Sequence, residues 1–73
     1  MGMPFDLNLS PMTGMELLAL RRELGLRQED LAAIAGYSRQ GTISECERGK
    51  RAVPQSLAVI LRLLIERRNR ASA

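Results

Sequence analysis

Residues 39–48, RQGTISECER, gather several side chains that form paired hydrogen bonds within one short segment. Arg39 and Arg48 carry guanidinium groups, which can donate two parallel bonds to the N7 and O6 atoms of guanine. Gln40 carries an amide group that can both donate to adenine and accept from it. If a helix presents these groups on one exposed face, they can contact the edges of base pairs in the major groove of DNA.

Helical geometry predicts which side chains of this segment face outward, because successive residues lie 100° apart around the axis. With Ile43 toward the core, Cys46 and Glu47 flank it on the inner side. The glycine among the outward positions would let a backbone approach the groove closely. The predicted base-contacting residues are Arg39, Gln40, Gly41, Ser44, Glu45 and Arg48.

The start of this helix is predicted from the position of Arg39. If the helix extended back to Arg39, its guanidinium would point about 40° from Ile43, toward the core. An unpaired charge is costly to bury. We therefore predict that Ser38 and Arg39 lie in a turn, and that the helix runs from near Gln40 to Arg48.

Two residues of the segment keep alternative interpretations. Glu45 either accepts a hydrogen bond from a cytosine amino group or is an exposed acid paired with Arg48 three residues on. Cys46 is either a small buried hydrophobic residue or a redox-sensitive thiol.

Two helices are predicted before this segment. Thr13 and Glu16 match a capping box, Leu17, Leu20 and Leu24 repeat on one face, and Gly25 ends the helix. The next helix runs from about Gln28 to Ala35 and is ended by Gly36.

The second of these helices has an unusual start. Arg27 occupies its capping position, where a Ser or Thr side chain would accept a backbone hydrogen bond. Glu29 and Asp30 in the first turn partly compensate through the helix dipole. Leu31 and Ile34 are predicted to face the core.

A fourth helix is predicted to begin at Pro54, since proline is well tolerated in a first turn. Its segment 57–65, LAVILRLLI, has more apolar residues than one buried face needs. Residues predicted to cover the core are Leu57, Ile60, Leu61 and Leu64. Residues left over for a dimer interface are Val59, Leu63 and Ile65. In the alternative, an N-terminal arm, residues 1–12, folds back over them through Phe5, Leu7 and Leu9. The arm itself is either extended or frayed.

Composition indicates one small all-α domain with an aliphatic core: 45% of the 73 residues are hydrophobic and 3% are aromatic. Residues 1–47 carry four arginines and seven acids, whereas residues 48–73 carry seven Lys or Arg and one acid. This asymmetry within a net charge of +3 indicates either a polyanionic partner or a solvated basic tail.

Several functional classes are disfavoured by missing residue types. The chain has no histidine and one cysteine, so a zinc site and an internal disulfide are not expected. It shows no glycine-rich phosphate loop and no paired carboxylates in an evident pocket. We therefore expect no enzyme, no cofactor, no metal and no small-molecule ligand. Without a leader or a long apolar run, a cytoplasmic protein that does not enter membranes is expected.

The motif set over residues 17–64 resembles the lambda-repressor-like, Cro-type (XRE) helix-turn-helix family. The matching residues are Leu17, Leu20, Arg21, Gly25, Leu26, Gln28, Leu31, Ala32, Gly36, Ser38, Thr42, Ile43, Ser44, Glu47, Gly49, Lys50 and Arg51. The chain departs from the pattern in one place, since Thr42 follows Gly36 by six residues where the family usually has five. The resemblance implies a compact domain of four or five helices over residues 13–70.

The same resemblance implies binding to double-stranded DNA. A lone helix-turn-helix domain of this size resembles the small autoregulators of phages, plasmids, toxin–antitoxin loci and anti-CRISPR operons. Predicted contacts to the DNA backbone come from Gln28, Tyr37, Ser38, Thr42, Lys50 and Arg51. For Lys50 and Arg51 the alternative is a role in solubility alone.

The predicted function is a sequence-specific transcriptional regulator, acting as a repressor or autorepressor. A homodimer would place two helices on a palindromic operator, with half-sites about one helical turn apart. The alternative is a protein-interaction module, such as an antitoxin or adaptor, that uses the fourth helix.

Overall fold

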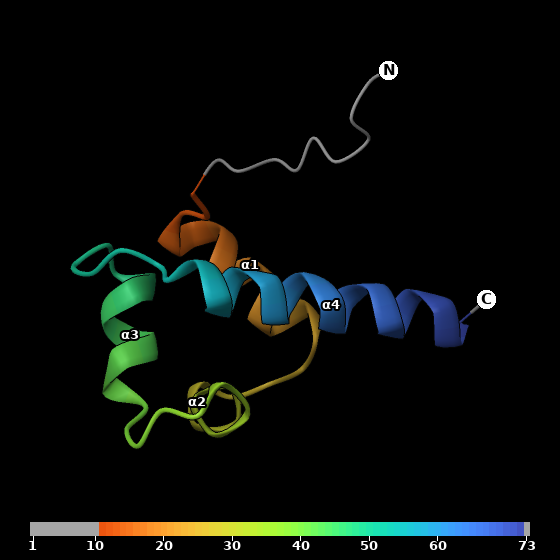
Figure 1. Cartoon of the computed structure of the whole chain (residues 1–73), viewed down its shortest axis with the longest axis horizontal. Coiled ribbons are helices and arrows are strands. Elements are labelled where there is room, and N and C mark those ends of the chain that lie inside the picture. Colours follow the sequence, from red (N-terminus) through yellow and green to blue (C-terminus); the bar gives the residue numbers. More distant parts are fainter. Residues whose placement is uncertain (1–10, 73) are drawn as a thin grey trace.

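The computed structural model describes residues 11–72, which form four helices and no strand (Figure 1). These are α1 (Gly14–Glu23), α2 (Gln28–Ala35), α3 (Gly41–Glu47) and α4 (Gln55–Ser72). The all-α prediction is confirmed. No helix among these residues is both long enough and apolar enough to span a membrane. Phe5, Leu7 and Leu9 lie outside the described residues.

α4 runs along the long axis of the molecule, and α3 lies across one end of it (Figure 1). α1 packs against both α3 and α4, and α2 packs against α3. In Figure 1 α2 is seen nearly end-on while α3 lies nearly in the plane, so the two helices cross steeply. α3 is therefore held from behind by two helices.

The start of α1 is fixed by the predicted capping box. The Thr13 hydroxyl accepts a bond of 3.1 Å from the Glu16 N–H, and the Glu16 carboxylate accepts one of 2.8 Å from the Thr13 N–H. Each side chain thus satisfies a backbone donor that the first helical turn leaves free.

The start of α2 is stabilised by an acid in place of a capping hydroxyl. Asp30 accepts hydrogen bonds from both the backbone N–H and the guanidinium of Arg27, at 2.9 and 3.2 Å. The hydrogen bonds of the Arg27 side chain and backbone lower the pKa of the Asp30 carboxyl. Asp30 thus compensates for the missing capping hydroxyl by direct hydrogen bonds as well as through the helix dipole.

The core lies where the four helices meet, and it is aliphatic as predicted. Its fully or nearly fully buried residues are Met12, Leu17, Leu31, Ala32, Ile43, Cys46, Leu57, Ala58 and Leu61. Leu20 and Leu24 pack against this cluster from α1. Met12, which precedes α1, therefore belongs to the core.

The prediction that Ile34 faces the core is wrong, because 49% of its surface is exposed. The inner face of α2 is formed by Leu31, Ala32 and Ala35. At 100° per residue, Ile34 lies about 60° beyond Leu31, on the side away from Ala32. The two alanines occupy the inner face because α3 passes close to the α2 backbone there.

The connection between α2 and α3 contains the one additional residue by which this chain exceeds the usual family spacing. Gly36 has a left-handed φ of 84°, and the Tyr37 N–H donates to the Ala32 carbonyl at 2.8 Å, which closes the end of α2. α3 begins at Gly41 with Gln40 as its N-cap, so Arg39 lies in the turn. The predicted placement of Ser38 and Arg39 is confirmed.

Gly14 permits the close packing of α1 on α3. A Cβ atom at this position would overlap the Cys46 carbonyl oxygen and lie 3.1 Å from that of Glu47. Both obstacles are backbone atoms, which a change of side-chain rotamer cannot move. The first turn of α1 thus rests directly on the last turn of α3.

We expect Gly14→Ala to destabilise the domain by about 2 kcal/mol, because α1 must move away from α3. Thermal unfolding followed by circular dichroism should show a decrease of roughly 10 °C in Tm. Gly41→Ala is the matched control, since Gly41 also opens a helix but its Cβ would contact only the tip of Arg39, at 3.7 Å. If both variants unfold at the wild-type temperature, the close contact at Gly14 is not structurally important.

Candidate nucleic-acid interface

α3 has one buried face and one exposed face, in the predicted register. Ile43 and Cys46 are fully buried. Arg48 at the end of the helix is exposed. The residues partly exposed along the outer and lateral faces are Gly41, Thr42, Ser44 and Glu45. The helix thus presents a continuous surface of small and polar residues between its two ends.

The turn before α3 adds two exposed side chains to this surface. Gln40 and Arg39 are both exposed. The Arg39 guanidinium lies 3.7 Å from the position that a Cβ of Gly41 would occupy. Because Gly41 is on the outer face of α3, Arg39 lies over that face. The glycine therefore provides space for the arginine as well as for a close approach by a ligand.

Glu45 pairs with Arg51, and not with Arg48 as one of the two interpretations predicted. Its Oε1 atom accepts bonds of 2.9 Å from Arg51 Nε and 2.7 Å from Arg51 Nη2. These bonds and the Arg51 charge, followed by the charges of Arg39 and Arg48, lower the pKa of the Glu45 carboxyl. Arg48 is thus near Glu45 but is not its ion-pair partner.

The loop after α3 is held against the end of the helix. The Lys50 N–H donates to the Glu45 carbonyl at 2.9 Å, and Gly49 adopts a left-handed φ of 78° that allows this closure. Lys50 and Arg51 are therefore exposed beside the last turn of α3.

Cys46 fits the first of its two interpretations, a small buried residue. The thiol lies 3.6 Å from the Ala52 carbonyl oxygen, to which it donates, and it has no exposed surface. Burial raises the pKa of the Cys46 thiol, which disfavours the reactive thiolate.

A buried ion pair joins the elements behind α3. Arg21 on α1 and Glu47 on α3 approach to 2.5 Å, with only 12% and 5% of their side chains exposed. Arg21 also donates to the Leu26 carbonyl at 2.9 Å. Glu47 in turn accepts from the Gln28 amide at 2.9 Å. This network links α1, the loop before α2, and both helices of the pair α2–α3.

Gln28, a predicted phosphate contact, therefore has a structural role in the free protein. One N–H of its amide is bonded to Glu47, and the side chain is partly buried. Tyr37 is also partly buried and packs against the core, whereas Ser38 is exposed. Their contacts with the DNA backbone stay predictions.

A family model described as a helix-turn-helix domain matches residues 14–64. This range includes α1, α2, α3 and the first half of α4. The chain belongs to the helix-turn-helix domain family. No match was found among curated proteins or among solved structures.

In a helix-turn-helix domain the second helix of the pair enters the major groove and the first lies across the DNA backbone. α2 and α3 are that pair here, so α3 occupies the position of the recognition helix. The family thereby supports DNA binding for this chain. Its predicted base-contacting residues all lie on the exposed surface of α3 or in the turn before it.

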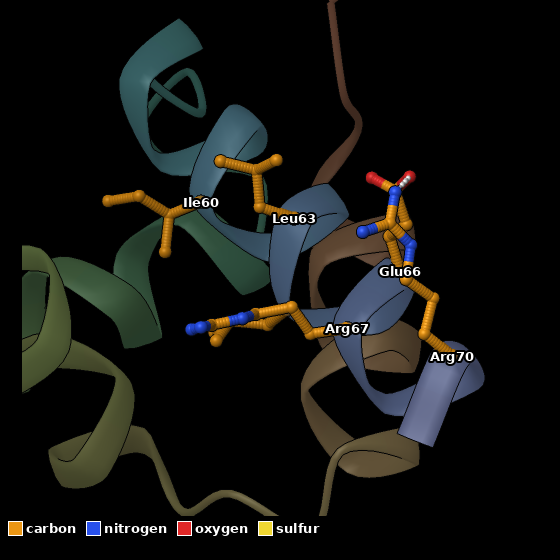
Figure 2. Close-up of a pocket in the computed structure, with 6 residues that line it drawn as sticks. Ile60, Leu63, Glu66, Arg67 and Arg70 are labelled. Carbon is orange, nitrogen blue, oxygen red and sulfur yellow. Dashed lines mark hydrogen bonds and ion pairs between the residues drawn. The ribbon is translucent and has the colours of Figure 1, made fainter. Parts of the chain in front are cut away.

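The outer face of α4 carries exposed apolar residues that were predicted to form a dimer interface. Val59 and Leu63 are 44% and 53% exposed. Beside them lies a groove of about 460 Å³, formed by Ile60, Leu63, Leu64, Glu66, Arg67 and Arg70. Figure 2 shows Ile60 and Arg67 projecting to the same side of α4.

Ile65 does not belong to this apolar surface, although it was predicted to form a dimer interface together with Val59 and Leu63. It is half-buried, and at 100° per residue it lies about 160° around the helix from Leu63. Its side of α4 also carries the buried residues Ala58 and Leu61. The surface available to a partner is therefore formed by Val59, Leu63 and the groove.

The sequence did not predict that Arg21, Gln28 and Glu47 contact one another. Arg21 and Glu47 matched the family motif, and Glu47 was predicted to point inward, but no partner followed from the spacing. The available signal was a charge at an inner helical position, because a buried charge requires a partner. Among residues 11–71, no cluster of His, Cys, Asp or Glu side chains is suited to bind a metal ion.

We expect Glu47→Gln to destabilise the domain by about 3 kcal/mol or more, because it leaves the buried Arg21 charge without a counter-charge. The double variant Arg21→Met, Glu47→Leu should be more stable than this single variant, since it removes both charges. Urea unfolding of the two variants tests the expectation. Glu23→Gln is the control, because its pair with Arg68 is exposed and should matter little. A double variant less stable than the single one would contradict this explanation.

Proposed function

We propose that this helix-turn-helix protein is a sequence-specific regulator of transcription that acts in the cytoplasm as a repressor or autorepressor. A homodimer binds a palindromic operator in double-stranded DNA. The observation that carries the proposal is the exposed outer face of α3, bordered by cationic groups at both ends. Arg39 lies over its start, and Arg48 and Lys50 lie at its end.

The proposed base contacts come from the two ends of α3. Arg39 and Arg48 each offer a guanidinium for guanine, and Gln40 offers an amide for adenine. All three side chains are exposed. Gly41 and Ser44 lie between them and are small, so the backbone can approach the base edges. This combination of small central residues and longer flanking donors suits insertion into the groove.

Phosphate contacts are proposed for groups around this surface. Lys50 is exposed beside the end of α3, and Ser38 and Thr42 flank its start. Such contacts fix the orientation of the protein on the duplex and carry no sequence information. They make binding sensitive to salt, because counterions are released from the DNA.

A dimer is proposed because one recognition helix contacts too few base pairs for useful specificity. Two-fold symmetric dimers of this class place their helices one turn of DNA apart. An interface related by a two-fold axis must be self-complementary. Val59 and Leu63 supply the apolar centre, and the Glu66–Arg70 pair beside them supplies both signs of charge (Figure 2).

The same surface of α4 supports a second candidate function, that of an antitoxin or adaptor which binds another protein. Exposed neighbouring aliphatic residues are typical of such interfaces. Salt-sensitive binding to an inverted repeat upstream of its own operon distinguishes the two candidates. A regulator binds that DNA selectively, whereas an adaptor does not.

We expect Arg39→Ala, Gln40→Ala and Arg48→Ala each to weaken operator binding by about 1–3 kcal/mol and to relax sequence selectivity. Lys50→Ala should instead weaken binding to all sequences and reduce the salt slope by about 0.9. Fluorescence anisotropy with operator and scrambled duplexes measures both effects. If operator affinity survives all three substitutions in the recognition surface, α3 does not contact the bases as proposed.

We expect the wild type to be a dimer at micromolar concentration in multi-angle light scattering. Val59→Glu, Leu63→Glu should be monomeric, because two acids replace the apolar centre of the interface. Met15→Glu is the matched control, since Met15 on α1 is 79% exposed and its replacement should leave the dimer intact. A wild type that stays monomeric with and without operator DNA would rule out this dimer, as would a dimeric double variant.

A further inference from the structure

Glu45 is an acid at the centre of the surface that would face the polyanionic DNA. It lies on the outer side of α3, opposite Ile43. Its carboxylate pairs with Arg51, and the charges of Arg39 and Arg48 also act on it. An acid in this place opposes DNA binding through its charge. A hydrogen bond to one particular base would let Glu45 contribute to sequence selectivity.

The two oxygens of this carboxylate are differently engaged. Both hydrogen bonds from Arg51 go to Oε1, at 2.9 and 2.7 Å. Oε2 accepts no hydrogen bond from residues 11–72. The Glu45 side chain is 38% exposed, so it is open to a ligand on α3. The ion pair therefore fixes the carboxylate through one oxygen and leaves the other as an acceptor.

The chemistry of the major groove limits which base can donate to Oε2. Guanine and thymine present acceptors there, N7 and O6 or O4, which repel a carboxylate. Adenine presents an amino donor, but its N7 acceptor lies beside it. Cytosine presents its N4 amino group with only the C5–H beside it on the same base, whereas the adenine amino group lies between two acceptors, its own N7 and the O4 of the paired thymine. Cytosine is therefore the base that best matches a carboxylate in this position.

We propose that Glu45 makes the domain selective for cytosine, with Arg51 as the positioning residue that holds the Glu45 carboxylate toward the groove. This inference rests on the proposed function, because it assumes that α3 enters the major groove. It assigns Arg51 to the recognition surface, in place of the phosphate contact that the sequence predicted.

The electrostatics of the ion pair fit this role. The hydrogen bonds from Arg51 lower the pKa of Glu45, so the carboxylate stays ionised at neutral pH and acts as an acceptor only. The guanidinium also offsets the negative charge that would otherwise face the phosphates. In addition, the Lys50 N–H bond to the Glu45 carbonyl ties the loop that carries Arg51 to the same residue.

The test begins with the full-length wild type and a library of duplexes that carry 20 randomised base pairs. Selection from this library gives the preferred site, in which every G·C pair supplies a cytosine. Affinities are then measured for that duplex and for duplexes in which each cytosine in turn is replaced by 2-pyrimidinone, which lacks the N4 amino group; we expect one cytosine of each half-site to be the one that Glu45 contacts. The wild type should lose about tenfold in affinity, the value of one hydrogen bond to a charged group.

Glu45→Ala should abolish this discrimination, so that both duplexes bind equally well. Glu45 is partly exposed on a helix, where alanine is well tolerated, and circular dichroism checks that the variant is folded. Glu45→Gln tests the charge, since the amide keeps the shape but is a weaker acceptor. Glu23→Ala is the matched control, because it also removes an ion-paired acid but lies on α1. It should leave the tenfold ratio unchanged.

The role of Arg51 has a readout of its own. Arg51→Ala should reduce the ratio between the two duplexes, and Arg51→Lys should restore part of it. A phosphate-contacting arginine would behave differently, since its loss would lower the salt slope by about 0.9 and leave the ratio unchanged. That result would overturn the assignment of Arg51 as a positioning residue.

Failure of this inference can be distinguished from failure of the proposed function. If the wild type selects no sequence from the library, the proposed function is wrong. If no replacement of a cytosine by 2-pyrimidinone lowers the wild-type affinity, or if Glu45→Ala keeps the tenfold ratio, the regulator stands and the role of Glu45 is wrong.

Discussion

The buried pair of Arg21 and Glu47 is the interaction on which the geometry of the domain depends. Its two charges cannot be buried separately, so α1 and α3 must meet where these side chains meet. Gln28 adds the start of α2 to the same carboxylate. Gly14 permits the required approach, because it brings the backbone of α1 against the Cys46 and Glu47 carbonyls. The orientation of α3 is thus set by polar contacts behind it.

In this arrangement the outer face of α3 does not pack in the core. Ile43, Cys46 and Glu47 make the contacts that hold the helix, and they occupy one side of it. The remaining side chains of α3 lie outside the buried core. The longer turn from Gly36 to Gln40 is tolerated for the same reason, since it lies between the αL cap of α2 and the first turn of α3. Its effect is to place Arg39 over Gly41.

The sequence was sufficient where the physics is local. The capping box at Thr13 and the glycine that ends α2 specify helix limits within a few residues, and the structure agrees. It was insufficient where the outcome depends on what packs opposite. Ile34 fits a helical apolar pattern, but the core packs against Leu31, Ala32 and Ala35 on another side of α2. Glu45 lies three residues from Arg48, yet it pairs with Arg51, which the turn at Gly49 brings back to the helix.

The distribution of charge shows the same difference between sequence and structure. Along the chain, seven of the eight acids precede position 48, and seven of the 11 basic residues lie at or after it. In space this separation is reduced, because Glu23 pairs with Arg68, 45 residues further along the chain, and Glu45 pairs with Arg51, six residues further along. Among the described residues, six cationic side chains make no ion pair: Arg39, Arg48 and Lys50 border α3, Arg22 lies on α1, and Arg62 and Arg67 lie on α4. Half of the unpaired positive charge therefore borders α3, the surface proposed to bind DNA.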